Sequence, residues 1–177
     1  MKNTFRKIND RLAGFSLLET IVVLFIVSVG LLGIVNLTIS SLKAQTLNRN
    51  TLIAYQLSQE GLELIRNVRD NNWLADRAWD YGITGTATGT KYKVDFSNFW
   101  PVEVNDIDEA TLQLASSTNP GFYLHDPASP NSLFSRMITI TIATTTAASS
   151  TVESLVQWTD QGQQREYRLQ TIIYDWQ

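Results

Sequence analysis

The sequence predicts an α+β protein with one long N-terminal α-helix packed on a small C-terminal antiparallel β-sheet. Two observations support this fold class. No proline interrupts residues 15–72, and helical periodicity follows the uniformly apolar start of that stretch. Beyond residue 90, short runs of β-branched and aromatic residues alternate with turn residues, without helical segments between them. Such closely spaced strands favour an antiparallel meander.

The first 14 residues form a short basic leader. Lys2, Arg6, Lys7 and Arg11 stand against Asp10, which gives a net charge of +3. Basic residues before an apolar segment stay in the cytoplasm, according to the positive-inside rule. We therefore expect a cytoplasmic N-terminus and an exported remainder.

Residues 15–39 form an apolar segment in which Glu19 is the only charged residue. At about 1.5 Å per residue this helix is roughly 37 Å long, enough to cross a bilayer. A carboxylate at membrane depth is disfavoured by about 2.5–3.5 kcal/mol on insertion scales, so Glu19 should have a partner for its charge. Gly30 and Gly33 indicate either close packing against another helix or a point where the helix can stretch.

Residues 40–72 form the amphipathic half of the helix, which we expect to end near Asp70–Asn72. One face shows apolar or small residues at spacings of three or four, and this face should pack on the sheet. Its members are Leu47, Thr51, Ala54, Leu57, Gly61, Leu64 and Val68.

Residues 73–177 form a β-rich globular head. The expected strands are Lys91–Phe96, Thr111–Ala115, Phe122–Leu124, Leu133–Thr145, Val152–Thr159 and Gln164–Trp176. The last two flank Asp160-Gln161-Gly162-Gln163, a hairpin signal with glycine in the turn. With no cysteine in the chain, packing alone must hold this head together.

Composition argues against several classes of function. The head carries six basic and twelve acidic residues, and a net charge of −6 disfavours nucleic-acid binding. His125 is the only histidine and should be a solvated loop residue, so neither a nucleophilic triad nor a zinc site can be built. We therefore expect no enzyme and no cofactor. Asp106, Asp108 and Glu109 form the densest acidic cluster, which favours a solvated loop over a calcium site.

All five tryptophans lie in the head. Most should fill the core between helix and sheet. Trp73, Trp79 and Trp100 lie in weakly patterned segments and are the candidates for an exposed binding surface. Loops 76–89 and 100–109 would carry such a surface.

One motif connects these features. Gly14-Phe15-Ser16-Leu17-Leu18-Glu19 follows the basic leader and resembles the processing motif of type IV prepilins and type II secretion pseudopilins. Residues 59–70, from Gln59 to Asp70, resemble the corresponding segment of minor pilins that modify or assemble a type IV pilus. The resemblance covers residues 1–72.

The resemblance implies a function and a set of partners. Prepilin peptidase would cut after Gly14 on the cytoplasmic side, and Phe15 would become the N-methylated first residue. Glu19 would then face the N-terminal amine of a neighbouring subunit in the filament. The implied partners are prepilin peptidase, other pilin subunits and an inner-membrane assembly platform. The implied location is a single-pass inner (cytoplasmic) membrane protein that assembles into a surface or periplasmic filament.

Two alternatives remain open at this point. A secretory signal peptide or an uncleaved anchor explains the basic flank and the apolar run, although not Glu19 or the Gly14–Phe15 junction. The other alternative is a membrane-anchored or pilus-tip adhesin, a binding module whose head recognises a surface or macromolecule. The sequence does not separate pilus, type II secretion and competence machines.

Overall fold

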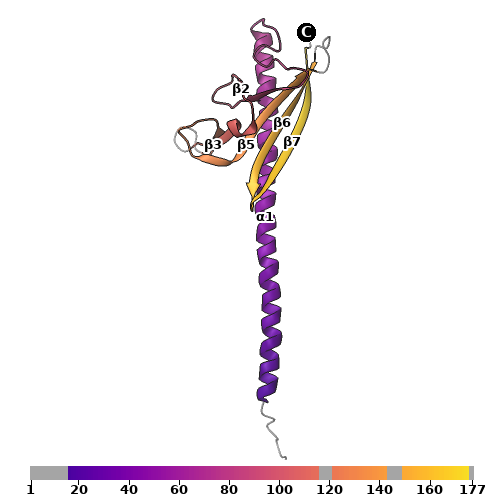
Figure 1. The fold of residues 1–177 in the computed structure, drawn as a ribbon, viewed down its shortest axis with the longest axis vertical. Coiled ribbons are helices and arrows are strands. Elements are labelled where there is room, and N and C mark those ends of the chain that lie inside the picture. Colours follow the sequence, from indigo (N-terminus) through magenta and orange to yellow (C-terminus); the bar gives the residue numbers. More distant parts are fainter. Residues whose placement is uncertain (1–15, 116–120, 143–148, 176–177) are drawn as a thin grey trace, which may run out of the picture. The chain divides into compact units, whose positions relative to one another are not determined.

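The computed structural model describes residues 16–115, 121–142 and 149–175. It confirms an α+β fold, in which one long N-terminal helix precedes a C-terminal antiparallel sheet (Figure 1). Helix α1 spans Leu17–Leu74 and ends two residues after the expected stop. The chain divides into two compact units, residues 1–46 and residues 47–177.

The second unit contains the rest of α1 and a seven-stranded sheet. In chain order its elements are β1 Thr90–Lys93, β2 Val102–Glu103, the 3-10 helix η1 Ile107–Ala110, β3 Thr111–Leu114, β4 Tyr123–Leu124, β5 Asn131–Ile142, β6 Ser149–Asp160 and β7 Gln163–Tyr174. The sequence missed β2 and η1, which are short and lack alternation. Each expected strand has a counterpart with shifted ends.

The sheet is more than a simple meander. β5, β6 and β7 form a meander of three long strands, but β1 and β3 both pair with the other edge of β5. β1 lies beside Ile138–Ile140, and β3 lies beside Asn131–Ser135. Central strand β5 thus gathers segments from far apart in the sequence.

The β6–β7 hairpin is closed by Gln161 and Gly162, as the sequence predicts. Both residues have positive φ angles, 51° and 77°. Two consecutive left-handed residues form the turn that matches the twist of a two-residue hairpin, and glycine adopts this conformation without steric cost. The turn fixes the register of β7 on β6 over the full length of both strands.

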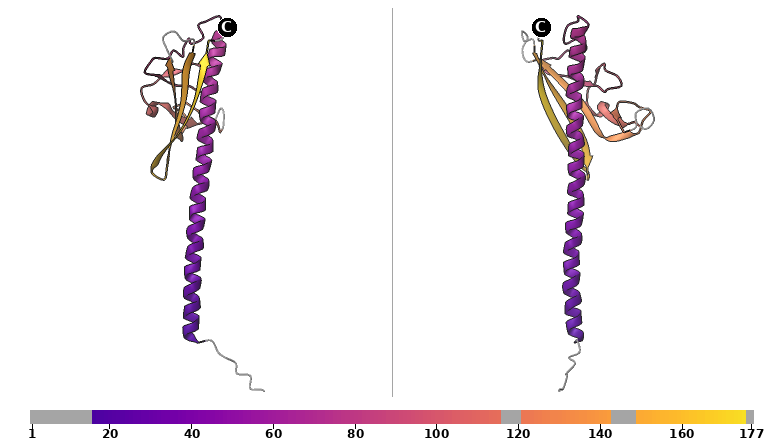
Figure 2. Two further views of the ribbon diagram at one scale, coloured as in Figure 1. Left: turned by 90° about the vertical axis from the view of Figure 1, so that its right-hand side faces the viewer. Right: turned by 180° about the vertical axis from the view of Figure 1, so that it is seen from behind.

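The core of the second unit lies between α1 and the sheet, which covers one side of the helix (Figure 2). Five of the seven residues expected on the packing face of α1 are buried: Ala54, Leu57, Gly61, Leu64 and Val68. Along β5, Phe134, Ile138 and Ile140 are buried in these two clusters. Because side chains alternate along a strand, Met137 lies on the opposite face of β5 from Ile138. It packs with Leu155 and the segment around η1.

Candidate functional site

The most unusual surface of the chain is the N-terminal part of α1. Every described residue from Ser16 to Thr46 is exposed, although most of the side chains are large and apolar. This stretch is long and apolar enough to cross a membrane, a property shared with signal sequences and with buried helices of soluble proteins. Because none of it is buried, its apolar surface requires another cover, either lipid or protein.

Several hydroxyl groups in this stretch form hydrogen bonds within the helix. Ser28 Oγ donates to Leu24 O at 2.7 Å, and Thr38 Oγ1 donates to Ile34 O at 2.9 Å. Hydroxyl groups that bond to the carbonyl four residues earlier need no water. These bonds within the helix suit an apolar environment, where no water is available to the hydroxyl groups. The sequence alone did not predict them.

Glu19 lies in the first turn of α1. Among the described residues it has no ion pair and no side-chain hydrogen bond. The partial positive charge at a helix N-terminus favours a carboxylate by about 0.3–1 kcal/mol. This is smaller than the cost of about 2.5–3.5 kcal/mol for an acid at membrane depth. The helix end alone therefore does not compensate Glu19 in a membrane. Gly14 and Phe15 lie outside the described residues.

Gly30 and Gly33 both lie within the continuous helix. A Cβ atom placed on either glycine would meet no atom within 4 Å. Nothing in the described part of the chain therefore requires glycine at these positions. Whether they serve helix–helix packing or local stretching stays a prediction.

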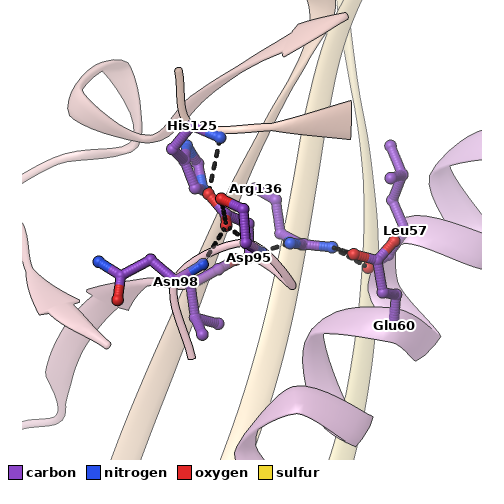
Figure 3. Close-up of polar contacts among 8 residues, drawn as sticks. Leu57, Glu60, Asp95, Asn98, His125 and Arg136 are labelled. Atoms are coloured by element: carbon purple, nitrogen blue, oxygen red, sulfur yellow. Dashed lines mark hydrogen bonds and ion pairs between the residues drawn. The ribbon is translucent and has the colours of Figure 1, made fainter. Parts of the chain in front are cut away.

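The head contains a buried arginine at its centre (Figure 3). Arg136 on β5 is 0% exposed. Its Nη1 donates to Leu57 O at 3.2 Å and its Nη2 to Val94 O at 2.6 Å. The same Nη1 forms an ion pair with Glu60 Oε1 at 3.2 Å. Arg136 thus joins the helix, the sheet and the chain after β1.

Two further polar residues, Asp95 and His125, lie beside Arg136 in the loops of the head (Figure 3). Asp95 accepts hydrogen bonds from the backbone amides of Ser97, Asn98 and His125 and from the Ser97 hydroxyl. Burial alone would raise the pKa of Asp95, but these four donors outweigh it and keep the pKa below its usual value. Asp95 therefore ties the loop after β1 to the residue after β4.

His125 is half-buried rather than solvated, which corrects the sequence prediction. Its Nδ1 lies 3.1 Å from Thr111 O, and because a carbonyl only accepts, Nδ1 carries the proton. Burial, and then the positive charge of Arg136, lower the pKa of His125 to about 4. The side chain is therefore neutral at pH 7 and serves the structure.

The acidic cluster forms local contacts. Asp106 caps η1, where its Oδ1 accepts from the amide of Ile107 at 2.6 Å. Glu109 accepts from the amide and the side chain of Asn105. Nowhere in residues 16–115, 121–142 and 149–175 do three potential metal-ligating side chains come together.

The three candidate tryptophans differ in exposure. Trp79 is partly buried against the core, whereas Trp73 is 55% exposed and Trp100 is 49% exposed. Trp158 is buried beside Phe134, and Trp176 lies outside the described residues. Trp100 borders a pocket at the C-terminal end of α1 that the sequence did not reveal.

Comparison of the chain with protein-family models, curated proteins and solved structures gives no match.

The sequence argument missed Arg136, although a signal was present. In Phe134-Ser135-Arg136-Met137-Ile138, the arginine occupies an inward position of an otherwise apolar strand face. The reasoning applied to Glu19, that a lone charge among apolar residues requires partners, would have identified it.

Proposed function

We propose that this protein is a structural subunit, a minor pilin or pseudopilin, of a type IV pilus or a related secretion filament. The observation that carries the proposal is Glu19, a lone carboxylate in the fully exposed apolar part of α1, residues 16–46. The fold, a long helix followed by an antiparallel sheet, is compatible with a pilin-like layout.

The proposed mechanism begins in the membrane. The apolar helix inserts with the basic leader inside and the head outside. Cleavage after Gly14 then creates an amine at Phe15, about one helical turn from Glu19. The carboxylate, unfavourable in lipid, becomes one half of an ion pair with the N-terminal amine of a neighbouring subunit. A buried ion pair need not add net stability, but removing one partner leaves the other charge uncompensated.

The apolar helices would then bundle in the filament core. Each helix exposes large apolar side chains around its whole circumference, so it can pack against several neighbours at once. The ion pair would set the axial register of each subunit, because apolar packing alone distinguishes registers poorly.

Intact-mass and N-terminal peptide analysis of the protein from its native membrane or filament fraction tests the proposal. We expect a mature chain that starts at N-methylated Phe15. Replacing Gly14 by leucine should leave the leader attached. Retention of residues 1–14 by the wild-type protein, in cells with an active prepilin peptidase, would instead identify a plain membrane anchor.

A binding function of the head is the second candidate, and it is compatible with the first. The observation in its favour is the ordered, exposed aromatic group around Trp100. Tyr81 packs edge-on against Trp100, with ring centres 5.9 Å apart, and both side chains are about half exposed. Surface aromatic residues held in fixed positions are typical of binding sites.

A further inference from the structure

A half-open pocket of about 210 Å³ lies in the head where α1 ends. Residues from the last turns of the helix form one side, and the loop after β1 forms the other. We call it the Trp100 pocket, and its lining residues are Val68, Asn71, Asn72, Arg77, Phe99 and Trp100. Pockets for drug-sized ligands occupy about 300–1,000 Å³, so this one suits a single ring-sized group.

The aromatic wall of the pocket is held in position by the chain. Gly82 has φ +78°, and a Cβ atom there would lie 3.0 Å from the ring of Trp100, so the backbone packs directly on the indole. The side chain of Asn72 donates to the carbonyls of Trp79 and Tyr81, at 3.1 and 2.7 Å. These contacts fix the segment that supports Trp100. The ring is therefore preorganised although it is half exposed.

The two aromatic side chains of the pocket also remain accessible. Phe99 is 52% exposed and Trp100 is 49% exposed. A core role does not explain two rings left half in water on one loop. Their flat apolar surfaces can accept the C–H face of a sugar ring.

The charge of the pocket is positive, unlike that of the head as a whole. Arg77 lines it, and none of the other lining residues is charged. The Arg77 guanidinium lies 5.4 Å from the centre of the Tyr81 ring and forms no ion pair with any described residue. In a head of net charge −6, an arginine without a carboxylate partner is available for an external anion.

We propose that the Trp100 pocket binds a sugar ring that carries a carboxylate, such as a uronic acid unit. The ring packs on Trp100 and Phe99, the carboxylate binds the Arg77 guanidinium, and Asn71 offers amide hydrogen bonds to hydroxyl groups. The lining residues include no carboxylate, so the pocket lacks the acid and base required for glycoside hydrolysis. It is a binding site, and it does not depend on filament assembly.

Trigalacturonic acid and its fully methyl-esterified form are the matched probes, because they differ only in the charge of the carboxyl groups. Both are titrated into the full-length protein in detergent micelles, with calorimetry or tryptophan fluorescence as the readout. We expect the acid to bind at least tenfold more tightly than the ester. Arg77→Gln should remove most of this preference, and Trp100→Ala should weaken both ligands at least tenfold.

Control variants separate the pocket from the general surface. Arg165→Gln removes an exposed guanidinium on β7, and Phe122→Ala removes an exposed ring, both outside the lining residues. Neither should change affinity more than twofold, whereas Trp100→Phe should retain part of it. Equal binding of acid and ester, an unaffected Trp100→Ala variant, or no binding at millimolar ligand would each overturn the proposal. Failure here leaves N-terminal processing and assembly unaffected, so the two proposals are tested separately.

Discussion

Arg136 and Glu19 are both single charges among apolar residues, but their surroundings differ. Arg136 is enclosed in the head. Its guanidinium donates to Leu57 O and Val94 O and forms an ion pair with Glu60. Glu19 is exposed on an apolar helix, and the described part of the chain gives its carboxylate no partner. Residues 47–177 thus contain the partners for their buried charge, whereas residues 16–46 require partners from outside. The difference therefore separates a part whose charge is compensated by its own contacts from an apolar part whose surface needs a cover of lipid or protein.

The largest effect should come from removing Arg136. Arg136→Ala leaves a cavity, the buried Val94 carbonyl without its donor and Glu60 without its ion-pair partner. Together these should destabilise the head by about 3–5 kcal/mol. Glu60→Gln keeps an oxygen beside the guanidinium, and the Glu60 side chain is 37% exposed. This variant should therefore lower the unfolding free energy less than Arg136→Ala does. Chemical denaturation followed by tryptophan fluorescence measures both, because all tryptophans lie in the head. Equal stability of Arg136→Ala and wild type would show that the head does not depend on this charge.

Acid should destabilise the head through His125. Its pKa is about 4 in the folded protein and 6.5 in the unfolded chain, so the unfolded state binds the proton first as the pH falls. The contribution of His125 to the unfolding free energy is therefore fully present above pH 6.5. It is lost as the pH falls toward 4, by about 3 kcal/mol in total.

A His125→Gln variant should show a flatter pH profile of unfolding free energy between pH 6.5 and 4.5. Asp95 also loses its stabilising contribution in acid, but only as the pH falls below 3.8 through its lowered pKa, outside this window. Parallel profiles for the variant and the wild type would mean that His125 is not the responsible group.

Two glycines of the same helix should respond differently to alanine. A Cβ atom on Gly61 would lie 2.8 Å from Ile138 Cδ1 and 2.8 Å from Ser154 Oγ, inside the packed core. Gly61→Ala should therefore destabilise the head by about 1 kcal/mol, since overpacking exceeds the gain in helix propensity. Gly30→Ala has open space around it and should leave head unfolding unchanged. A destabilised head in Gly30→Ala would contradict the independence of the two parts.

These residues also show how far sequence reasoning reaches. Hydrophobic periodicity predicted the long helix, most of its packing face and the long strands, because each is a local pattern. The pairing of both β1 and β3 with β5 was not predictable, since it depends on contacts between distant segments. The same holds for the half-buried position of His125 and for the Trp100 pocket. A lone histidine or tryptophan carries no local signal of its neighbours.

The smallest effect on the head, and the largest on assembly, should come from Glu19. Glu19→Leu removes no contact in the head, so the unfolding free energy should stay within about 0.3 kcal/mol of wild type. Leucine enters a membrane more readily than glutamate, so a failure to assemble would not reflect poor insertion. We expect the variant to be inserted and processed but depleted from filaments, as measured by immunoblots of membrane and sheared-filament fractions. Thr20→Val, one residue away on the same helix, is the control and should assemble normally. Incorporation of Glu19→Leu at wild-type levels would contradict the ion-pair mechanism.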